Sequence, residues 1–84
     1  MKITKNLETV LNEKFVFGEV KKIAESIIER MEGPTEEGLR QAMDDELIYD
    51  EDLWEIMKYY QRPSEANFYE AMDEFYNDLA EILG

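Results

Sequence analysis

The chain contains neither cysteine nor histidine among its 84 residues. Without cysteine it can form no disulfide and offers no thiolate as a nucleophile or metal ligand. Without histidine it lacks the side chain that most often acts as a general base or binds transition metals near neutral pH. None of its 21 acidic residues belongs to a recognisable catalytic motif. We therefore expect a protein that is not an enzyme and has no cofactor, no catalytic residue and no metal site.

Long hydrophobic runs are also missing, since the apolar stretches are only a few residues long. This excludes a membrane-spanning helix, and the first residues lack the pattern of a signal peptide. We expect a cytoplasmic protein. Because a polyanion is repelled by nucleic acid and by anionic lipid, we expect no direct binding to either.

Positive charge is scarce in one part of the chain. Residues 1–33 contain six acids and six bases, whereas residues 34–84 contain fifteen acids and three bases, so the net charge of −12 arises almost entirely in the second part. Solubility alone does not require the acids to be confined in this way. The confinement favours an acidic surface that meets a basic surface of a partner protein.

Proline and glycine are few, and they separate segments in which hydrophobic residues recur every three to four positions. This spacing is typical of amphipathic helices. We predict one all-α domain over residues 1–84, a compact bundle of four to five short helices. The Phe15-Val16-Phe17 run is compatible with a buried connector, a helix end or a short strand. The first predicted helix spans residues 5–14 with Thr4 or Asn6 as its cap, and the second runs from Glu19 until Gly33 and Pro34 stop it. A third is capped by Thr35, and a fourth is capped by Asp50 or Asp52 and continues through Gln61. A fifth follows the Arg62-Pro63-Ser64 break with Ser64 as its cap.

The last predicted helix has one face of carboxylates without a base among them. Like charges four residues apart cost about 0.2–0.5 kcal/mol each, and acids near the C-terminal end oppose the helix dipole. When a helix carries such unfavourable charges without a structural gain, a functional requirement is indicated. We assign this face to partner binding: Glu70, Asp73, Glu74, Asp78 and Glu81.

A second acidic block is denser, with seven carboxylates in twelve residues. Along a helix axis this corresponds to one charge per roughly 2.6 Å, between the spacing of roughly 3.4 Å for one DNA strand and 1.7 Å for the duplex. The alternative is that these acids form an ordinary solvent-exposed surface without a binding role. We assign these acids to partner binding: Asp44, Asp45, Glu46, Asp50, Glu51, Asp52 and Glu55.

The single tryptophan and all five tyrosines also lie in the acidic part. Exposed aromatic rings among carboxylates are suitable anchors for a protein interface. We expect Tyr49 and Tyr59 to serve this role, and Trp54 and Tyr60 to cap the core.

In size, charge and helical patterning the chain resembles the small acidic anti-defence proteins of phages and mobile elements, namely antirestriction DNA mimics and anti-CRISPR proteins. The stretch that carries the resemblance runs from Glu46 to Leu83. It is also similar to the colicin immunity proteins at Leu47-Ile48-Tyr49. The resemblance implies an inhibitor in the cytoplasm of a bacterial host that occupies the basic nucleic-acid-binding site of a nuclease, CRISPR effector or restriction protein.

A different class of function is a small helical adaptor or regulator that acts through an apolar interface or as a homodimer. On this hypothesis the acidic charge serves solubility alone. The candidate interface is then Phe15, Phe17 and the apolar stripe from Ile23 to Met31.

Overall fold

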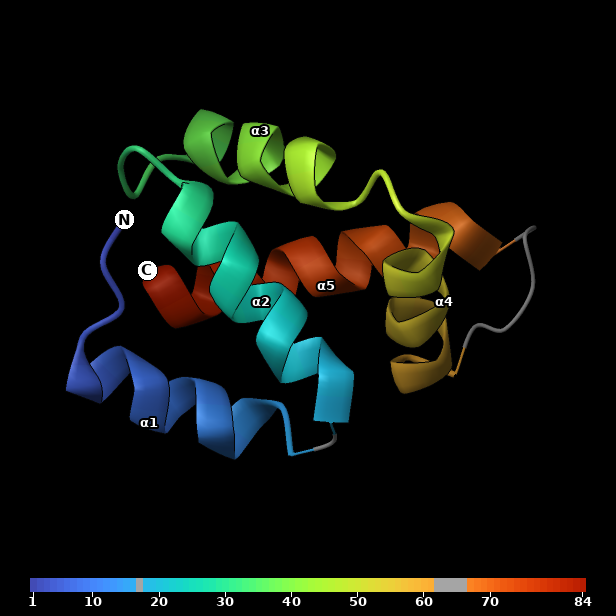
Figure 1. The fold of residues 1–84 in the computed structure, drawn as a ribbon, viewed down its shortest axis with the longest axis horizontal. Helices are drawn as coiled ribbons and strands as arrows, with labels where there is room; N and C mark the ends of the chain where they lie inside the picture. Colours follow the sequence, from blue (N-terminus) through green and yellow to red (C-terminus); the bar gives the residue numbers. More distant parts are fainter. Residues whose placement is uncertain (17, 62–66) are drawn as a thin grey trace.

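The computed structural model describes residues 1–16, 18–61 and 67–84, which form five α-helices and no strand. The predicted all-α bundle is therefore confirmed. Figure 1 shows the helices crossing one another around a shared interior. They are α1 (Lys5–Lys14), α2 (Gly18–Arg30), α3 (Glu36–Glu46), α4 (Asp50–Tyr59) and α5 (Phe68–Leu83).

Threonine caps begin two of the helices as the sequence predicts. The Thr4 hydroxyl accepts a hydrogen bond from the backbone N–H of Leu7, and the Thr35 hydroxyl accepts one from Gly38. The predicted cap of α4 is wrong, because Tyr49 occupies the N-cap without a side-chain hydrogen bond. Asp50 instead begins the first turn of α4, where the helix dipole favours a negative charge.

Two predicted helix ends lie too far along the chain. The helix α2 ends at Arg30, before Gly33 and Pro34. The helix α4 ends at Tyr59, because Gln61 adopts a left-handed backbone with φ of 57°.

In the run after α1, Phe15 is the buried C-cap of that helix and Val16 is exposed, and neither residue lies in a strand. Phe17 and the Arg62-Pro63-Ser64 break, including the predicted Ser64 cap, lie outside the described residues. Asn67 occupies the N-cap position of α5.

The interior is apolar and lies around α2 and α5. In Figure 1, α2 passes through the middle of the bundle, and it packs against α1, α3 and α4. The helix α5 packs against α1, α3 and α4. Among the described residues, every buried side chain is hydrophobic. The largest that are fully buried are Leu11, Phe15, Ile27, Ile28, Leu39, Ile56, Phe75 and Leu79.

Candidate protein-binding surface

Five of the predicted carboxylates lie in the last turn of α3, the first turn of α4 and the second turn of α5, and we call these five residues the acidic surface. All five are exposed, and none forms an ion pair with another residue in the described part of the chain. Their charges are therefore not neutralised by the fold. The acidic surface consists of Asp44 and Asp45 in the last turn of α3, Asp50 and Glu51 in the first turn of α4, and Asp73 of α5.

Several other carboxylates predicted to bind a partner form ion pairs within the fold. Glu46 is 2.7 Å from Arg30 and its side chain is only 15% exposed. Glu55 pairs with Lys58 at 2.8 Å. These side chains connect or stabilise helices, so they are less available to a partner.

The acids of α5 differ in their burial and in the residues that surround them. Asp78 is half-buried and contacts Lys14 at 3.4 Å, so it does not belong to an open face. Glu74 is also half-buried, whereas Glu70 and Glu81 are exposed. Glu81 lines a hollow with Val10 and Glu13 of α1, away from the residues that share hollows with α3 and α4.

One of the aromatic predictions, for Trp54, is wrong, and Tyr59 is less exposed than an interface role favours. Tyr59, expected at an interface, is half-buried, donates a hydrogen bond to the Lys14 carbonyl at 2.8 Å, and contacts the Phe15 ring. Trp54, expected to cap the core, is 45% exposed. Tyr60 does cap the core, and Tyr49 is exposed as an interface residue should be. By exposure alone, Trp54 is more accessible to a partner than Tyr59.

The Tyr60 hydroxyl connects α4 to α5 by donating a hydrogen bond to the Asp78 carboxylate at 2.5 Å. Burial and this hydrogen bond raise the pKa of Tyr60 well above its usual value. An unfolded tyrosine ionises near pH 10, so the folded protein should lose stability as the pH rises beyond that value.

Removing this hydrogen bond should be costly. We expect Tyr60→Phe to lower the free energy of unfolding by about 1–2 kcal/mol, because the acceptor is a charged, half-buried carboxylate. Chemical denaturation at pH 7 measures this loss. The matched control is Tyr59→Phe, which removes a hydrogen bond to a neutral carbonyl. A loss for Tyr60→Phe no greater than for the control would contradict the role of Asp78.

Asp52 lies where the fold disfavours its charge. Partial burial, followed by repulsion from Glu46 and Glu51, raises the pKa of Asp52 above its ordinary value. These two effects oppose the favourable interaction of a negative charge with the helix dipole in the first turn of α4. Asp52 therefore reduces stability at neutral pH, and the loss disappears once the pH falls below the unfolded value near 3.8.

Replacing Asp52 should stabilise the domain at neutral pH. We expect Asp52→Asn to raise the free energy of unfolding by about 0.2–0.5 kcal/mol at pH 7, the size of a relieved like-charge contact. Denaturation at several pH values should show the gain vanishing by about pH 4. Asp50→Asn is the control, because Asp50 is exposed and its replacement removes only a favourable dipole interaction. An equal gain in the control would contradict this explanation.

Two adjoining hollows lie beside the acidic surface, between α3, α4 and α5. The first has a volume of about 410 Å³ and the second about 270 Å³. They share Leu53, Phe68 and Tyr69 as lining residues. Asp44 and Asp73 line the first hollow, and Asp50 lines the second. We call the two hollows together the α3–α5 groove.

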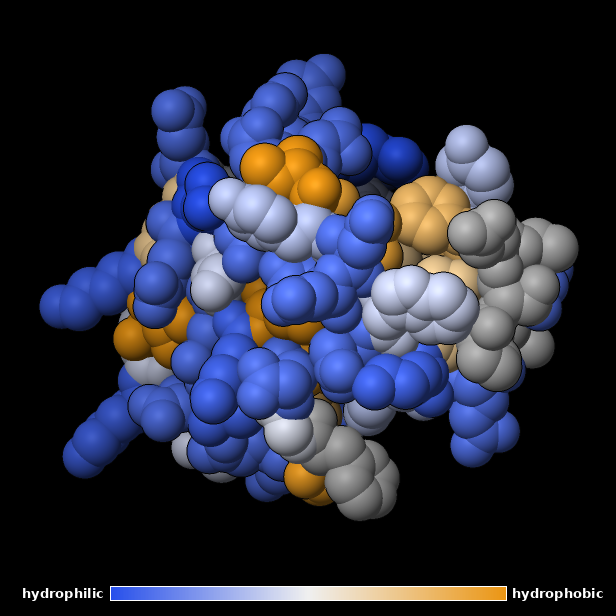
Figure 2. All heavy atoms as spheres, turned by 45° about the vertical axis from the view of Figure 1, so that its right-hand side comes forward, coloured by the Kyte–Doolittle hydropathy of each residue, from blue (hydrophilic) through white to orange (hydrophobic). Residues whose placement is uncertain are grey.

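Exposed hydrophobic side chains accompany the acids on this part of the molecule. Tyr69 is 78% exposed, and Ile48 and Tyr49 are each about two-thirds exposed. Figure 2, which brings the α4 side of the molecule forward, shows separate hydrophobic side chains set in a largely hydrophilic surface. The charged and aromatic residues therefore occur together, as the sequence predicts.

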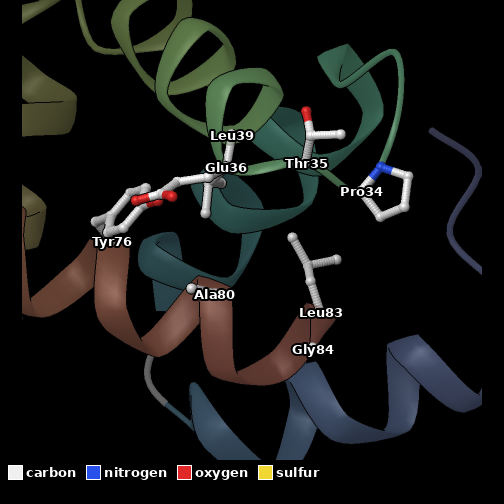
Figure 3. Close-up of a pocket in the computed structure, with 8 residues that line it drawn as sticks. All are labelled: Pro34, Thr35, Glu36, Leu39, Tyr76, Ala80, Leu83 and Gly84. Atoms are coloured by element: carbon white, nitrogen blue, oxygen red, sulfur yellow. The ribbon is translucent and has the colours of Figure 1, made fainter.

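A further hollow of about 300 Å³, separate from the α3–α5 groove, lies where the beginning of α3 faces the C-terminal half of α5 (Figure 3). Its carboxylate, Glu36, points toward Tyr76 and pairs with Arg40 at 3.8 Å. Burial and a hydrogen bond with Glu36 raise the pKa of Tyr76. This hollow contains no residue that the sequence singles out for partner binding.

No group of three or more carboxylates within residues 1–16, 18–61 and 67–84 is arranged to hold a metal ion. Over the same ranges, no helix combines the length and hydrophobicity that a membrane crossing requires. Comparison of the chain with protein-family models, curated proteins and solved structures found no match.

Proposed function

We propose that the protein is a noncatalytic inhibitor that uses the acidic surface to occupy the basic nucleic-acid-binding site of another protein. The observation that carries the proposal is the group of five exposed carboxylates, none of which pairs with a base in the described residues. Arginines and lysines that normally contact phosphates would contact these carboxylates instead.

The position of the acids supports a functional origin. Asp44 and Asp45 lie at the C-terminal end of α3, where the helix dipole disfavours negative charge, and the last turn contains no base. Exposed side chains at these positions could be lysine without loss of packing. Their acidity therefore costs stability that binding to a basic partner would offset.

The resemblance to phage and mobile-element anti-defence proteins supports a particular class of partner. A nuclease, CRISPR effector or restriction protein has a basic channel that must accept the closely spaced charges of nucleic acid. An inhibitor of such a channel would act in the bacterial cytoplasm and needs no cofactor.

The alternative, an adaptor or homodimer with an apolar interface, cannot use the face first suggested for it. Phe15 and the apolar stripe from Ile23 to Met31 are buried, and Phe17 lies outside the described residues. The exposed Ile48 and Tyr49 favour an apolar contact at the acidic end of the molecule instead. A dimer in this region would have to bring like charges together.

Affinity capture from a bacterial lysate tests the proposal. We expect the immobilised protein to retain nucleic-acid-binding proteins at low salt and to release them when salt or duplex DNA is added. The eluted proteins are identified by mass spectrometry. Capture that resists both salt and DNA, and that yields a partner without a nucleic-acid site, would favour the adaptor function.

A further inference from the structure

We propose that the α3–α5 groove binds an arginine side chain of the basic partner, in preference to lysine. This inference rests on the proposed function and specifies how the acidic surface recognises its partner. It is carried by the combination of apolar lining, exposed aromatic rings and carboxylates around the same two hollows.

The lining provides each contact that an arginine requires. Leu53, Phe68 and Met72 offer apolar surface for the methylene groups of the side chain. Tyr69 is 78% exposed, so most of its side chain is accessible to a planar guanidinium. Asp44 from α3 and Asp73 from α5 provide carboxylates beside the first hollow.

The chain already contains one example of this recognition at the edge of the groove. The guanidinium of Arg40 lies 4.5 Å from the centre of the Tyr76 ring, and it pairs with Glu36 at 3.8 Å. Arg40 and Tyr76 both line the first hollow. The surface next to them combines an exposed tyrosine and carboxylates that have no paired base among the described residues.

Arginine is favoured over lysine because its planar guanidinium can stack on the flat face of an aromatic ring. A guanidinium stacks on an aromatic ring and is more weakly hydrated than an ammonium group, so it loses less on entering a partly apolar groove. A site of charge alone would bind the two side chains about equally. The volume of about 410 Å³ lies within the usual range for small-ligand sites.

Trp54 provides a direct measurement, since it is the only tryptophan and lines the second hollow. Two short peptides of equal length and charge, one with arginines and the other with lysines, are titrated into the full chain at low salt. We expect the arginine peptide to change the Trp54 fluorescence and to bind at least about fivefold more tightly than the lysine peptide.

Two variants distinguish binding within the groove from attraction by the surrounding negative charge. Tyr69→Ala should weaken arginine-peptide binding by about fivefold to tenfold and should abolish most of the preference over lysine. Val16→Ala is the control, because Val16 is 66% exposed, follows the C-terminal end of α1 and lines neither hollow. It should leave the preference unchanged. Circular dichroism of both variants checks that the helices are retained.

The outcomes distinguish this inference from the function on which it rests. Equal binding of the two peptides, unaffected by Tyr69→Ala, would overturn the arginine site and leave an acidic surface that binds by charge. Failure of both peptides to bind at low salt would overturn the arginine site and count against the acidic surface as well. Arginine-selective binding without capture of any nucleic-acid-binding protein would support the groove and contradict the proposed function.

Discussion

Binding to a basic partner should fall by more than about 100-fold when four carboxylates of the acidic surface are replaced. The variant is Asp44→Lys, Asp45→Lys, Asp50→Asn and Glu51→Gln. Each lysine adds two units of charge and each amide one, so the formal charge changes from −12 to −6. A loss of about 0.7–1.5 kcal/mol at each of four contacts gives this factor. Surface plasmon resonance with the captured partner measures it.

The choice of replacements keeps the domain folded. Lysine at the C-terminal end of α3 interacts favourably with the helix dipole, so Asp44→Lys and Asp45→Lys should not destabilise it. Neutral amides at Asp50 and Glu51 avoid placing a positive charge in the first turn of α4. Denaturation curves should therefore stay close to those of the unchanged protein.

A matched control changes the same charge elsewhere. Four exposed acids in residues 1–33 accept the same pattern of replacement: Glu13→Lys, Glu29→Lys, Glu8→Gln and Glu32→Gln. This control also has a charge of −6, so it tests net charge without altering the acidic surface. We expect it to weaken binding by less than about tenfold, through long-range attraction alone. Equal losses in the two variants would show that location is unimportant and would contradict the proposed surface.

Phe75→Ala should strongly destabilise the domain. Phe75 is fully buried on α5, 5.8 Å from the Phe15 ring centre and 6.2 Å from that of Tyr60. Emptying this position should cost about 3–5 kcal/mol. A domain of this size has a total stability on the order of 4–13 kcal/mol, so the variant should be partly or wholly unfolded at 37 °C.

Thermal unfolding followed by circular dichroism measures this effect. Phe75→Leu retains most of the buried volume and should lose less than the alanine variant. Tyr69→Ala lies on the same helix but is exposed, so it should change the stability by less than about 0.5 kcal/mol. A small loss for Phe75→Ala would mean that the rings of α1, α4 and α5 do not hold the bundle together.

The fold was largely predictable because its cues are local. Helical spacing of hydrophobic residues and the Thr4 and Thr35 caps act within a few residues of each position. The end of α4 was misplaced because it depends on backbone geometry at Gln61, which no side-chain pattern specifies. Burial of the stripe from Ile23 to Met31 also required knowing that α2 is surrounded by α1, α3 and α4.

The candidate surface was predictable only in part. The density of acids along the sequence identifies Asp44, Asp45, Asp50 and Glu51 as surface residues. Their exposure depends on their positions within a single helical turn and not on distant contacts. The contacts of Asp78 are not predictable from its own segment, because its partners, Lys14 and Tyr60, are distant in the sequence. The partial burial of Tyr59 is hidden from the sequence for the same reason, since its acceptor is the distant Lys14 carbonyl. The α3–α5 groove depends on three helices meeting, and no single segment indicates it.

The central claim is that this protein and nucleic acid occupy the same site on the partner. The most direct measurement is the affinity of the protein for its captured partner at increasing concentrations of the partner's own nucleic acid. Simple competition predicts that the apparent Kd rises in proportion to nucleic-acid concentration and that no ternary complex forms. A Kd that stays constant, with a ternary complex detected by gel filtration, would contradict the claim.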